Sequence, residues 1–213
     1  MSASDEKRLA AEAAAELVVA GMAVGLGTGS TVGYFLPALA ARRLAIRCVA
    51  TSLETERAAR ELGLDLEPFD ALDRLDLAVD GADQVAPDGW LVKGGGAAQT
   101  RERIVAAADE RLVVIVSSDK LVERLGPPVP LELHAFGLQA TLRRLGDATL
   151  RDVPPTPDGG LIADYSGSVG DPAALATRLD ADPGVVSHGL FPPALVSLVL
   201  IGRGQSVNEI QLF

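Results

Sequence analysis

Residues 79–105 have the sequence VDGADQVAPDGWLVKGGGAAQTRERIV, and the rest of the chain is organised around them. The apolar run 75–79 predicts a buried strand that places Asp80 at its carboxyl end. Residues 90–92 predict a second, short strand that leads into Lys93. Open α/β sheets bind ligands beyond the carboxyl ends of their strands, so both side chains are expected at a ligand site.

A helical pattern follows from about Ala97, with Ile104 and Ala108 on one face. Glu102 is therefore expected near the start of a helix. The run Gly94 to Gly96 precedes this helix and leaves backbone amides uncovered by side chains, which suits an anion. Carboxylates, a lysine and a glycine run at such positions together indicate an active site.

Strands alternate with helices through the first part of the chain. Further strands are expected at 22–26, 46–50 and 112–116, and further helices from Ser4 to before Gly21, at about 32–41 and at 54–62. Ser4 is the expected cap of the first helix. The alternation predicts an α/β fold in which helices cover both faces of a parallel sheet.

The pattern changes after Gly126. Strands are expected at 129–133, 148–152, 161–165 and 185–190, and helices at 135–145 and 172–179, the last capped by Asp171. This order is the split βαβ pattern of a small ferredoxin-like unit. We therefore expect a catalytic domain formed by 1–126 with 202–213 and a small domain at 127–201, whose last strand, about 195–201, returns to the main sheet.

The formal net charge of −10 argues against a nucleic-acid partner, because a phosphate backbone requires a basic face. An anionic ligand must then be held by local cations and backbone amides. The single Cys48 excludes an internal disulfide and suits a reducing compartment. The amino terminus does not resemble a signal peptide, and no apolar run approaches a membrane span. We expect a cytoplasmic homodimer or homotetramer with no membrane partner.

The loop GLGTGST, residues 25–31, lies between an expected strand and an expected helix, where free amides can meet an anion. It departs from the dinucleotide fingerprint, because Ser30 occupies the third glycine position and the next strand ends in Thr51 and Ser52 instead of an acid. Hydroxyls and amides suit a phosphate better than a nicotinamide ribose. A tight turn built on glycine is the alternative, which the neighbouring hydroxyls weaken.

Each candidate also has an ordinary structural interpretation. Asp80 and Asp83 suit turns equally well, and Glu102 suits an exposed first turn of a helix. Lys93 beside three glycines favours an anion site, because a cation next to bare amides is a poor core element. Isolated cations and imidazoles are more often solvated or packed than ligands, and this applies to Lys7, Lys120, His134 and His188. No spacing of histidines with carboxylates suggests a metal site, so no metal and no cofactor are expected.

Seven motifs occur in the order found in ribose-5-phosphate isomerases of the A type: GLGTGST, ATSLET, VDGAD, LVKGGGAAQTRERIV, SSDK, VPLEL and DPGVVSHGLF. The chain resembles this family from about residue 21 to 191, and VDGAD with KGGG and TRE is highly specific. The resemblance implies a Rossmann-like domain carrying a small ferredoxin-like domain. Where the family usually has DGADE, this chain has Gln84, which puts a charge-dependent role of residue 84 in doubt.

The resemblance implies that Glu102 is the catalytic base and that Asp80, Asp83 and Lys93 surround the sugar. It directs the loop 28–31 and Lys120 toward the substrate's phosphate. The expected substrate contacts are Thr28, Gly29, Ser30, Thr31, Gly81, Ala82, Gly94, Gly95, Gly96, Lys120 and Lys7. The substrate pair would be D-ribose 5-phosphate and D-ribulose 5-phosphate, in the non-oxidative pentose phosphate pathway.

Such an isomerisation moves one proton between two carbons through an enediolate, and a single carboxylate can carry that proton. Two other functions were weighed. A sugar-phosphate sensor without catalysis is opposed by the net charge and by the absence of a DNA-binding segment in the sequence. A nucleotide-dependent oxidoreductase is opposed by the broken fingerprint.

Overall fold

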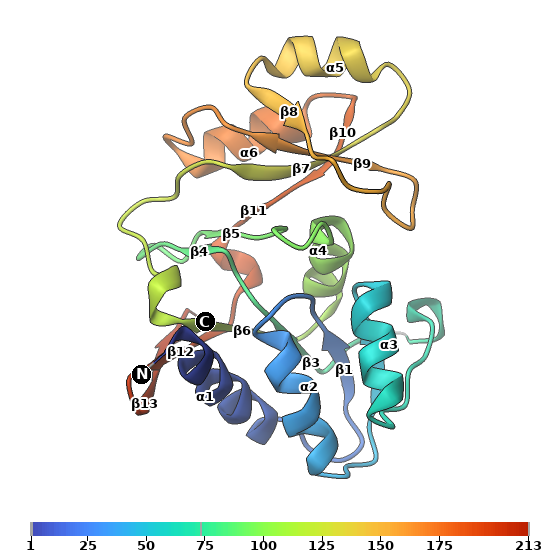
Figure 1. The fold of residues 1–213 in the computed structure, drawn as a ribbon, viewed down its shortest axis with the longest axis vertical. Helices are drawn as coiled ribbons and strands as arrows, with labels where there is room; N and C mark the ends of the chain where they lie inside the picture. Colours follow the sequence, from blue (N-terminus) through green and yellow to red (C-terminus); the bar gives the residue numbers. More distant parts are fainter. Residues whose placement is uncertain (1, 73, 213) are drawn as a thin grey trace. The chain divides into compact units, whose positions relative to one another are not determined.

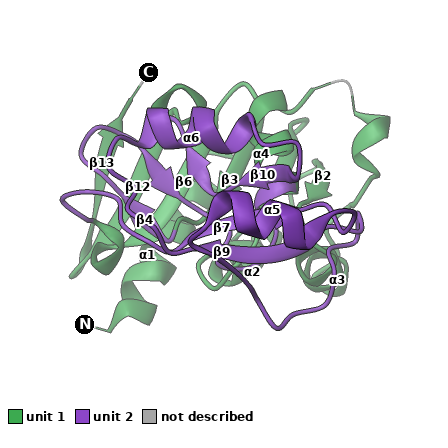
Figure 2. Ribbon diagram, turned by 90° about the horizontal axis from the view of Figure 1, so that it is seen from above, with its two compact units in different colours: residues 1–82, 101–121, 193–213 green, residues 83–100, 122–192 purple. Residues whose placement is uncertain are grey.

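The computed structural model describes residues 2–72 and 74–212, which form two compact units (Figure 1). Figure 2 shows unit 1, formed by residues 1–82, 101–121 and 193–213, and unit 2, formed by 83–100 and 122–192. Compared with the expected small domain at 127–201, unit 2 also takes in 83–100, and residues 193–201 belong to unit 1. The strand pairings described below account for both differences.

The sheet of unit 1 has the order β13-β12-β6-β3-β1-β2. Its strands are β1 (Ala23–Leu26), β2 (Arg47–Ala50), β3 (Leu77–Asp80), β6 (Leu112–Ser117), β12 (Leu198–Arg203) and β13 (Ser206–Gln211). All neighbours are parallel except β13, which runs antiparallel to β12. The sequence order reverses between β1 and β3, and doubly wound sheets bind ligands beyond the carboxyl ends of the strands at that reversal. The α/β fold with a mainly parallel sheet is confirmed.

Helices cover both faces of this sheet. On one face, α1 (Ala3–Glu16) and α2 (Val32–Ala41) pack on the buried side chains of β1, β3, β6 and β12. The other face receives α4 (Gln99–Ala108), where a Cβ at Gly25 would lie 2.7 Å from the Val105 side chain. A third helix, α3 (Leu53–Glu61), follows β2 and is capped by Ser52.

Two expectations about these helices are wrong. The cap of α1 is Ser2, not Ser4: its hydroxyl accepts from the Asp5 amide at 3.3 Å, and the Asp5 carboxylate accepts from the Ser2 amide at 3.1 Å. The pair forms a capping box two residues earlier than expected. In α4, Ile104 is 51% exposed, and Val105 is buried instead, because the face against β1 is shifted by one residue.

The larger sheet of unit 2 is antiparallel, with the order β10-β7-β9-β8. Its elements follow the chain as β7 (Val129–Leu133), α5 (Leu138–Leu145), β8 (Ala148–Leu150), β9 (Leu161–Tyr165), α6 (Pro172–Asp180) and β10 (Val185–His188). This is the expected split βαβ arrangement. Helix α5 begins three residues later than expected, because Gly137 before it has φ +71°, outside the helical region. The expected cap Asp171 does accept from the first amides of α6.

A second sheet in unit 2 has the order β11-β5-β4, and of its strands only β5 was expected, as the short strand at 90–92. It is formed by β4 (Gln84–Val85), β5 (Leu91–Val92) and β11 (Leu190–Phe191). Gly189 separates β11 from β10, so the single strand expected at 185–190 is wrong. A Cβ at Gly189 would collide with the Lys93 carbonyl, and the Gly189 carbonyl accepts from the Lys93 amide at 2.8 Å. This pairing joins residues 83–100 to unit 2.

Candidate active site

In unit 1, the loop between β1 and α2 lies against the carboxyl end of β3. A Cβ at Gly27 would collide with the Asp80 carboxylate, so only glycine allows this approach. Asp80 Oδ1 accepts from the amides of Thr28 at 3.1 Å and Gly81 at 2.7 Å. The loop and Asp80 therefore meet where the sheet order reverses, and Asp80 lies at the carboxyl end of its strand, as expected from the sequence.

Two threonines that follow β2 hold this loop in place through their hydroxyl groups. The hydroxyls of Thr28 and Thr51 are 2.8 Å apart, and the Thr55 hydroxyl donates to the Gly27 carbonyl at 2.8 Å. Gly29 and Ser30, at the tip of the loop, are exposed, and Gly29 has φ +122°. Thr31 makes no side-chain capping bond at the start of α2, although the Gly33 amide of the first turn donates to the Gly29 carbonyl of the loop at 3.0 Å.

Lys7 and Lys120 both lie in unit 1, and the Glu6 carboxylate links the two elements that carry them. Lys7 Nζ donates to Ser30 Oγ at 2.9 Å, which brings α1 to the loop. The preceding Glu6 accepts from the Ser118 amide at 2.9 Å, the Ser118 hydroxyl at 2.7 Å and the Gly204 amide at 2.9 Å. These bonds, from Gly204 first and Ser118 next, lower the pKa of Glu6 to about 2. Glu6 thus fixes α1 to the short 3-10 turn η2 (Ser118–Lys120) that carries Lys120.

Asp80 and Glu102 are both 4% exposed, although each is a carboxylate. Asp80 ends β3, and Glu102 lies in the first turn of α4, as predicted. Burial of an ionisable side chain needs specific partners, and such groups concentrate at functional sites. Both positions therefore fit chemistry better than the turn and surface interpretations.

Unit 2 carries the other expected residues. Asp83 Oδ2 accepts from the Gly95 amide at 2.8 Å, while Gly95 and Gly96 themselves are exposed. Gly94 has φ +96°, and a Cβ there would lie 2.8 Å from Gln99 and 2.9 Å from Pro130, so this position requires glycine. Lys93 is 2% exposed, and its ammonium lies 5.4 Å from the centre of the Phe191 ring. The glycine run is thus an exposed loop with a fixed start.

Gln84, which replaces the acid of the family motif, has a structural role. Its amide nitrogen donates to the Gly126 carbonyl at 2.9 Å, and its amide oxygen accepts from the Gly126 amide at 2.8 Å. A carboxylate can only accept, so glutamine matches this backbone group on both sides.

Two expected contacts, Gly81 and Ala82, lie on the chain between Asp80 and Asp83 and are partly exposed. Neither histidine belongs to the group of candidate site residues described above. His134 is exposed, and the buried His188 accepts from the Leu190 amide at 3.2 Å through Nδ1. Within residues 2–72 and 74–212, no group of three or more His, Cys, Asp or Glu side chains is placed to hold a metal ion.

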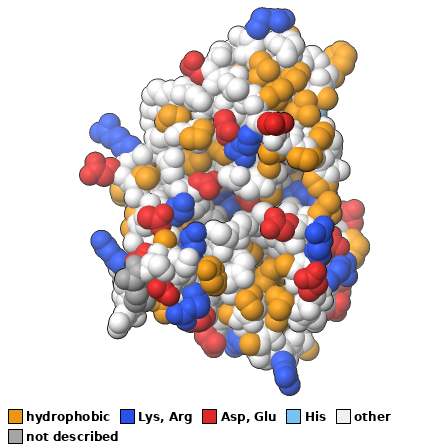
Figure 3. Space-filling view, viewed as in Figure 1, with side chains coloured by type: hydrophobic (Ala, Val, Ile, Leu, Met, Phe, Trp, Pro, Cys, Tyr) orange, Lys and Arg blue, Asp and Glu red, His pale blue; other side chains and the backbone are white. Residues whose placement is uncertain are grey.

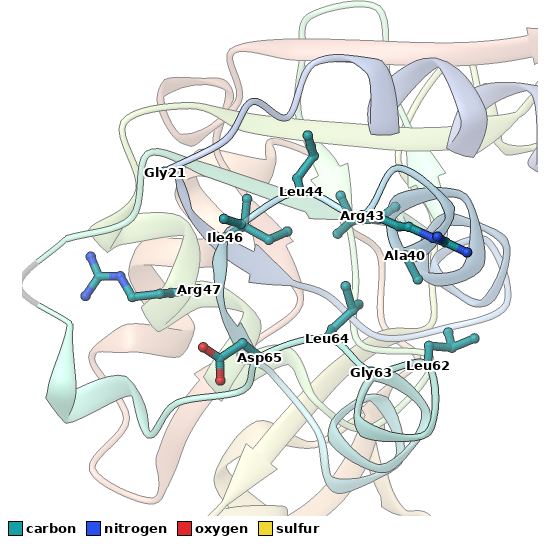
Figure 4. A pocket seen from close by; sticks show the side chains of 12 residues that line it. Gly21, Ala40, Arg43, Leu44, Ile46, Arg47, Leu62, Gly63, Leu64 and Asp65 are labelled. Carbon is teal, nitrogen blue, oxygen red and sulfur yellow. The ribbon is translucent and has the colours of Figure 1, made fainter.

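A hollow of about 690 Å³ lies at the opposite, amino end of β1 and β2 (Figure 4). It is lined mainly by apolar parts of 39–47 and 62–65, with Arg43, Arg47 and Asp65 at its edge. Asp65 is exposed, so this hollow lacks a buried carboxylate for proton transfer. We therefore assign the chemistry to the carboxyl ends of the strands.

The surface and the helices add two observations. On the face drawn in Figure 3, lysine and arginine side chains are scattered among aspartates and glutamates, without a continuous basic patch. No helix in the described part of the chain is long and apolar enough to cross a membrane.

Comparisons with known proteins show which family the chain is similar to. Residues 47–206 match the family model described as ribose 5-phosphate isomerase A (phosphoriboisomerase A). A curated ribose-5-phosphate isomerase A from Caulobacter sp. (strain K31) is 48% identical over 225 residues, which cover 99% of each chain. A solved ribose 5-phosphate isomerase A from Methanocaldococcus jannaschii has TM-score 0.93 and 32% identity, covering 99% of this chain and 100% of its own. The same values hold for a solved D-ribose-5-phosphate isomerase in complex with phospho-erythronic acid.

Proposed function

The chain belongs to the ribose 5-phosphate isomerase A family and is an aldose–ketose isomerase, and we propose that it interconverts D-ribose 5-phosphate and D-ribulose 5-phosphate through an enediolate with Glu102 as the base. The observation that carries the proposal is the buried Glu102 carboxylate near the start of α4. Helix α4 packs on the sheet whose order reverses at the Asp80 and Thr28 contact. We also propose that the enzyme acts as a homo-oligomer in the cytoplasmic, non-oxidative pentose phosphate pathway.

The proposed proton transfer needs one carboxylate. Glu102 removes the proton from C2 of the open-chain aldose, the electron pair moves into the C1–C2 bond, and O1 becomes an oxyanion. The same carboxyl group then returns the proton to C1, while the proton of the O2 hydroxyl is transferred to O1, so that a ketone forms at C2 and a hydroxyl at C1. The net change is zero in atoms and electrons, so no redox cofactor is needed.

The remaining residues have roles that follow from their charge. Asp80 and Asp83 would move hydroxyl protons, including those of ring opening. The Lys93 ammonium and the amides of Gly94 and Gly96 would donate to the developing oxyanion, while the Gly95 amide donates to Asp83. Such fixed donors are each worth about 10²–10³-fold in kcat. General base catalysis supplies about 10²–10⁴-fold, so this oxyanion cradle must contribute a comparable share.

The phosphate would bind at the start of α2. Hydroxyls and amides of 28–31 meet the positive end of the helix dipole there, with Lys7 on Ser30 and Lys120 on the neighbouring turn. In a chain of net charge −10, these local groups must supply the attraction for the phosphate dianion.

The direct test is incubation of the purified enzyme with ribose 5-phosphate, without added metal or nicotinamide, and detection of the ketopentose phosphate. We expect turnover to survive exhaustive chelation. Loss of turnover that a divalent ion restores would contradict the proposed chemistry. Phospho-erythronic acid carries a carboxylate that resembles the two-oxygen enediolate, so it should inhibit competitively.

A further inference from the structure

We propose that Arg151 is a positioning residue that holds the carbonyl side of the loop Gly94 to Gly96, so that the amides of this loop keep the direction that oxyanion binding requires. The inference rests on the proposed function of that loop. Arg151 lies in the ferredoxin-like part of the chain, and it acts on the loop rather than on the substrate.

All three nitrogens of the Arg151 guanidinium group donate hydrogen bonds. Arg151 Nη1 donates to the carbonyls of Gly94 at 3.3 Å and Gly95 at 3.1 Å. Its Nε and Nη2 donate to the two oxygens of Asp164 at 2.8 Å and 2.6 Å. The two side chains are only 21% and 26% exposed. A two-pronged arginine–carboxylate pair of this kind has a defined geometry, so Asp164 aims the remaining nitrogen at the loop.

The carbonyl contacts determine where the amides point. In a trans peptide unit the C=O and the next N–H point in opposite directions. A bond from Arg151 to the Gly94 carbonyl therefore turns the Gly95 amide away from Arg151, and that amide donates to Asp83 at 2.8 Å. By the same geometry, the bond to the Gly95 carbonyl turns the Gly96 amide away from the guanidinium.

A run of glycines needs contacts from other residues to keep its backbone in one conformation. Three glycines in succession have no side chains to restrict their backbone angles, and an unrestrained loop would lose the fixed donor directions on which oxyanion stabilisation depends. Arg151 is itself held by the sheet: its amide donates to the Ile162 carbonyl at 2.9 Å, and Asp164 lies in β9. The ferredoxin-like sheet thus supplies a rigid support for a flexible loop.

The charges favour the same arrangement. The Asp164 carboxylate raises the pKa of Arg151, and Asp83 adds to this effect, so the cation is retained at any pH at which the enzyme folds. A permanent cation on the carbonyl side also polarises the two peptide groups, which makes their amides better donors.

The test compares Arg151→Lys with Arg144→Lys. Arg144 forms a similar pair with Asp182 in the same unit, at 2.9 Å and 2.7 Å, and its other hydrogen bond goes to Thr141 instead of the glycine loop. Lysine keeps the positive charge but lacks the planar, two-pronged donor group of arginine. We expect Arg151→Lys to lower kcat by about tenfold or more with KM changed by less than about threefold, because the lost interaction belongs to the transition state. Arg144→Lys should leave both parameters near the wild-type values.

Exchange of the substrate's C2 hydrogen with solvent should fall in step with kcat in Arg151→Lys. Asp164→Asn, which loosens the fork but leaves the cation, should show a smaller loss of the same kind and serves if Arg151→Lys does not fold. Equal kcat in both arginine variants, or an unchanged kcat in Asp164→Asn when only that variant folds, would overturn the inference. If the wild-type enzyme itself formed no ketopentose phosphate, the proposed function would fail instead.

Discussion

The chain has three lysines, Lys7, Lys93 and Lys120, and all three are among the residues that sequence and geometry assign to the site. The other positive side chains are arginines. Lysine carries a compact, strongly hydrated charge with three donors, which suits a mobile phosphate or a developing oxyanion. Lys93 is placed by the Gly189 carbonyl, and Lys7 by Ser30.

Lys120→Ala should raise KM for ribose 5-phosphate more than it lowers kcat, because a contact to the remote phosphate stabilises ground state and transition state alike. A KM rise of about tenfold would correspond to about 1.4 kcal/mol of binding energy. Steady-state kinetics would measure both parameters. The control Arg8→Ala removes an equal charge from the helix surface, where Arg8 pairs with Glu12. A fall in kcat with unchanged KM would exclude Lys120 from phosphate binding.

Asp109 offers a pH-dependent prediction outside the site. Burial raises its pKa from 3.8 to about 7. The folded state thus holds a proton that the unfolded chain releases above about pH 4, so Asp109 makes stability fall as pH rises from about 4 to 7. Asp109→Asn should remove this dependence of stability on pH.

Melting temperatures of Asp109→Asn and the wild type should therefore be similar near pH 4 and diverge toward pH 8, with the variant more stable. The exposed Asp70→Asn serves as control. A difference that is constant with pH would show that the Asp109 carboxyl group does not titrate as described.

At the scale of elements, the sequence predicted the strands of both larger sheets except β13, because apolar runs and flanking turns are local signals, whereas β13 is largely exposed and has no such run. Helix boundaries depended on details that it did not show: the cap at Ser2, and the left-handed Gly137 before α5. Of the sheet β11-β5-β4, only β5 was predicted, as the strand at 90–92. The other two strands, β4 and β11, have two residues each, carry no periodicity and form only through pairing with β5.

The residues of the candidate site divide in the same way, into those with a local signal in the sequence and those that depend on distant contacts. Asp80, Asp83, Lys93 and the glycine run were identified from strand ends and motif. Supporting residues such as Glu6 and Arg151 were missed, because their partners are 112 and 57 residues away in the sequence. Only the resemblance to a family gave Glu102 its role as base, since a first-turn glutamate has no distinctive local signal.

Gln84→Glu tests how β4 is fixed in unit 2. Restoring the family's acid removes the donor to the Gly126 carbonyl and places a negative charge against it. We expect a loss of about 1–3 kcal/mol in the free energy of unfolding at pH 7, and a smaller loss near pH 4, where a protonated carboxyl can donate. The exposed Gln205→Glu makes the same charge change. Equal stability of the two variants in denaturant titrations would contradict the two-way bond.

At the scale of the whole molecule, the chain combines a parallel sheet, which holds Asp80, Glu102 and the phosphate loop, with an antiparallel unit that holds Asp83, Lys93 and the glycine run. The sequence predicted this division of fold types from the change of pattern after Gly126. The compact units differ from the expected border at 83–100, where short strand pairings decide which unit the segment joins, whereas the strand at about 195–201 was expected to return to the main sheet.

Neither histidine is needed by the proposed chemistry. His134 is exposed, and His188 is packed between Leu190 and Asp180. A His134→Ala variant should keep near-normal kcat and KM, and a folded His188→Ala should also turn over, although with a lower melting temperature because it leaves a cavity. A loss of several hundredfold in kcat for His134→Ala would move the chemistry toward that imidazole.

The central claim is that Glu102 carries the proton between C1 and C2, and hydrogen exchange reports that step directly. Glu102→Gln keeps the shape of the side chain and removes its basicity, so turnover should fall by about 10²-fold or more while substrate still binds. Glu110→Gln, on an exposed carboxylate paired with Arg74, is the matched control. In deuterated water, exchange of the substrate's C2 hydrogen should fall in step with turnover in Glu102→Gln and remain unchanged in Glu110→Gln. Exchange at the wild-type rate in Glu102→Gln would show that another group is the base, with Asp80 the next to test.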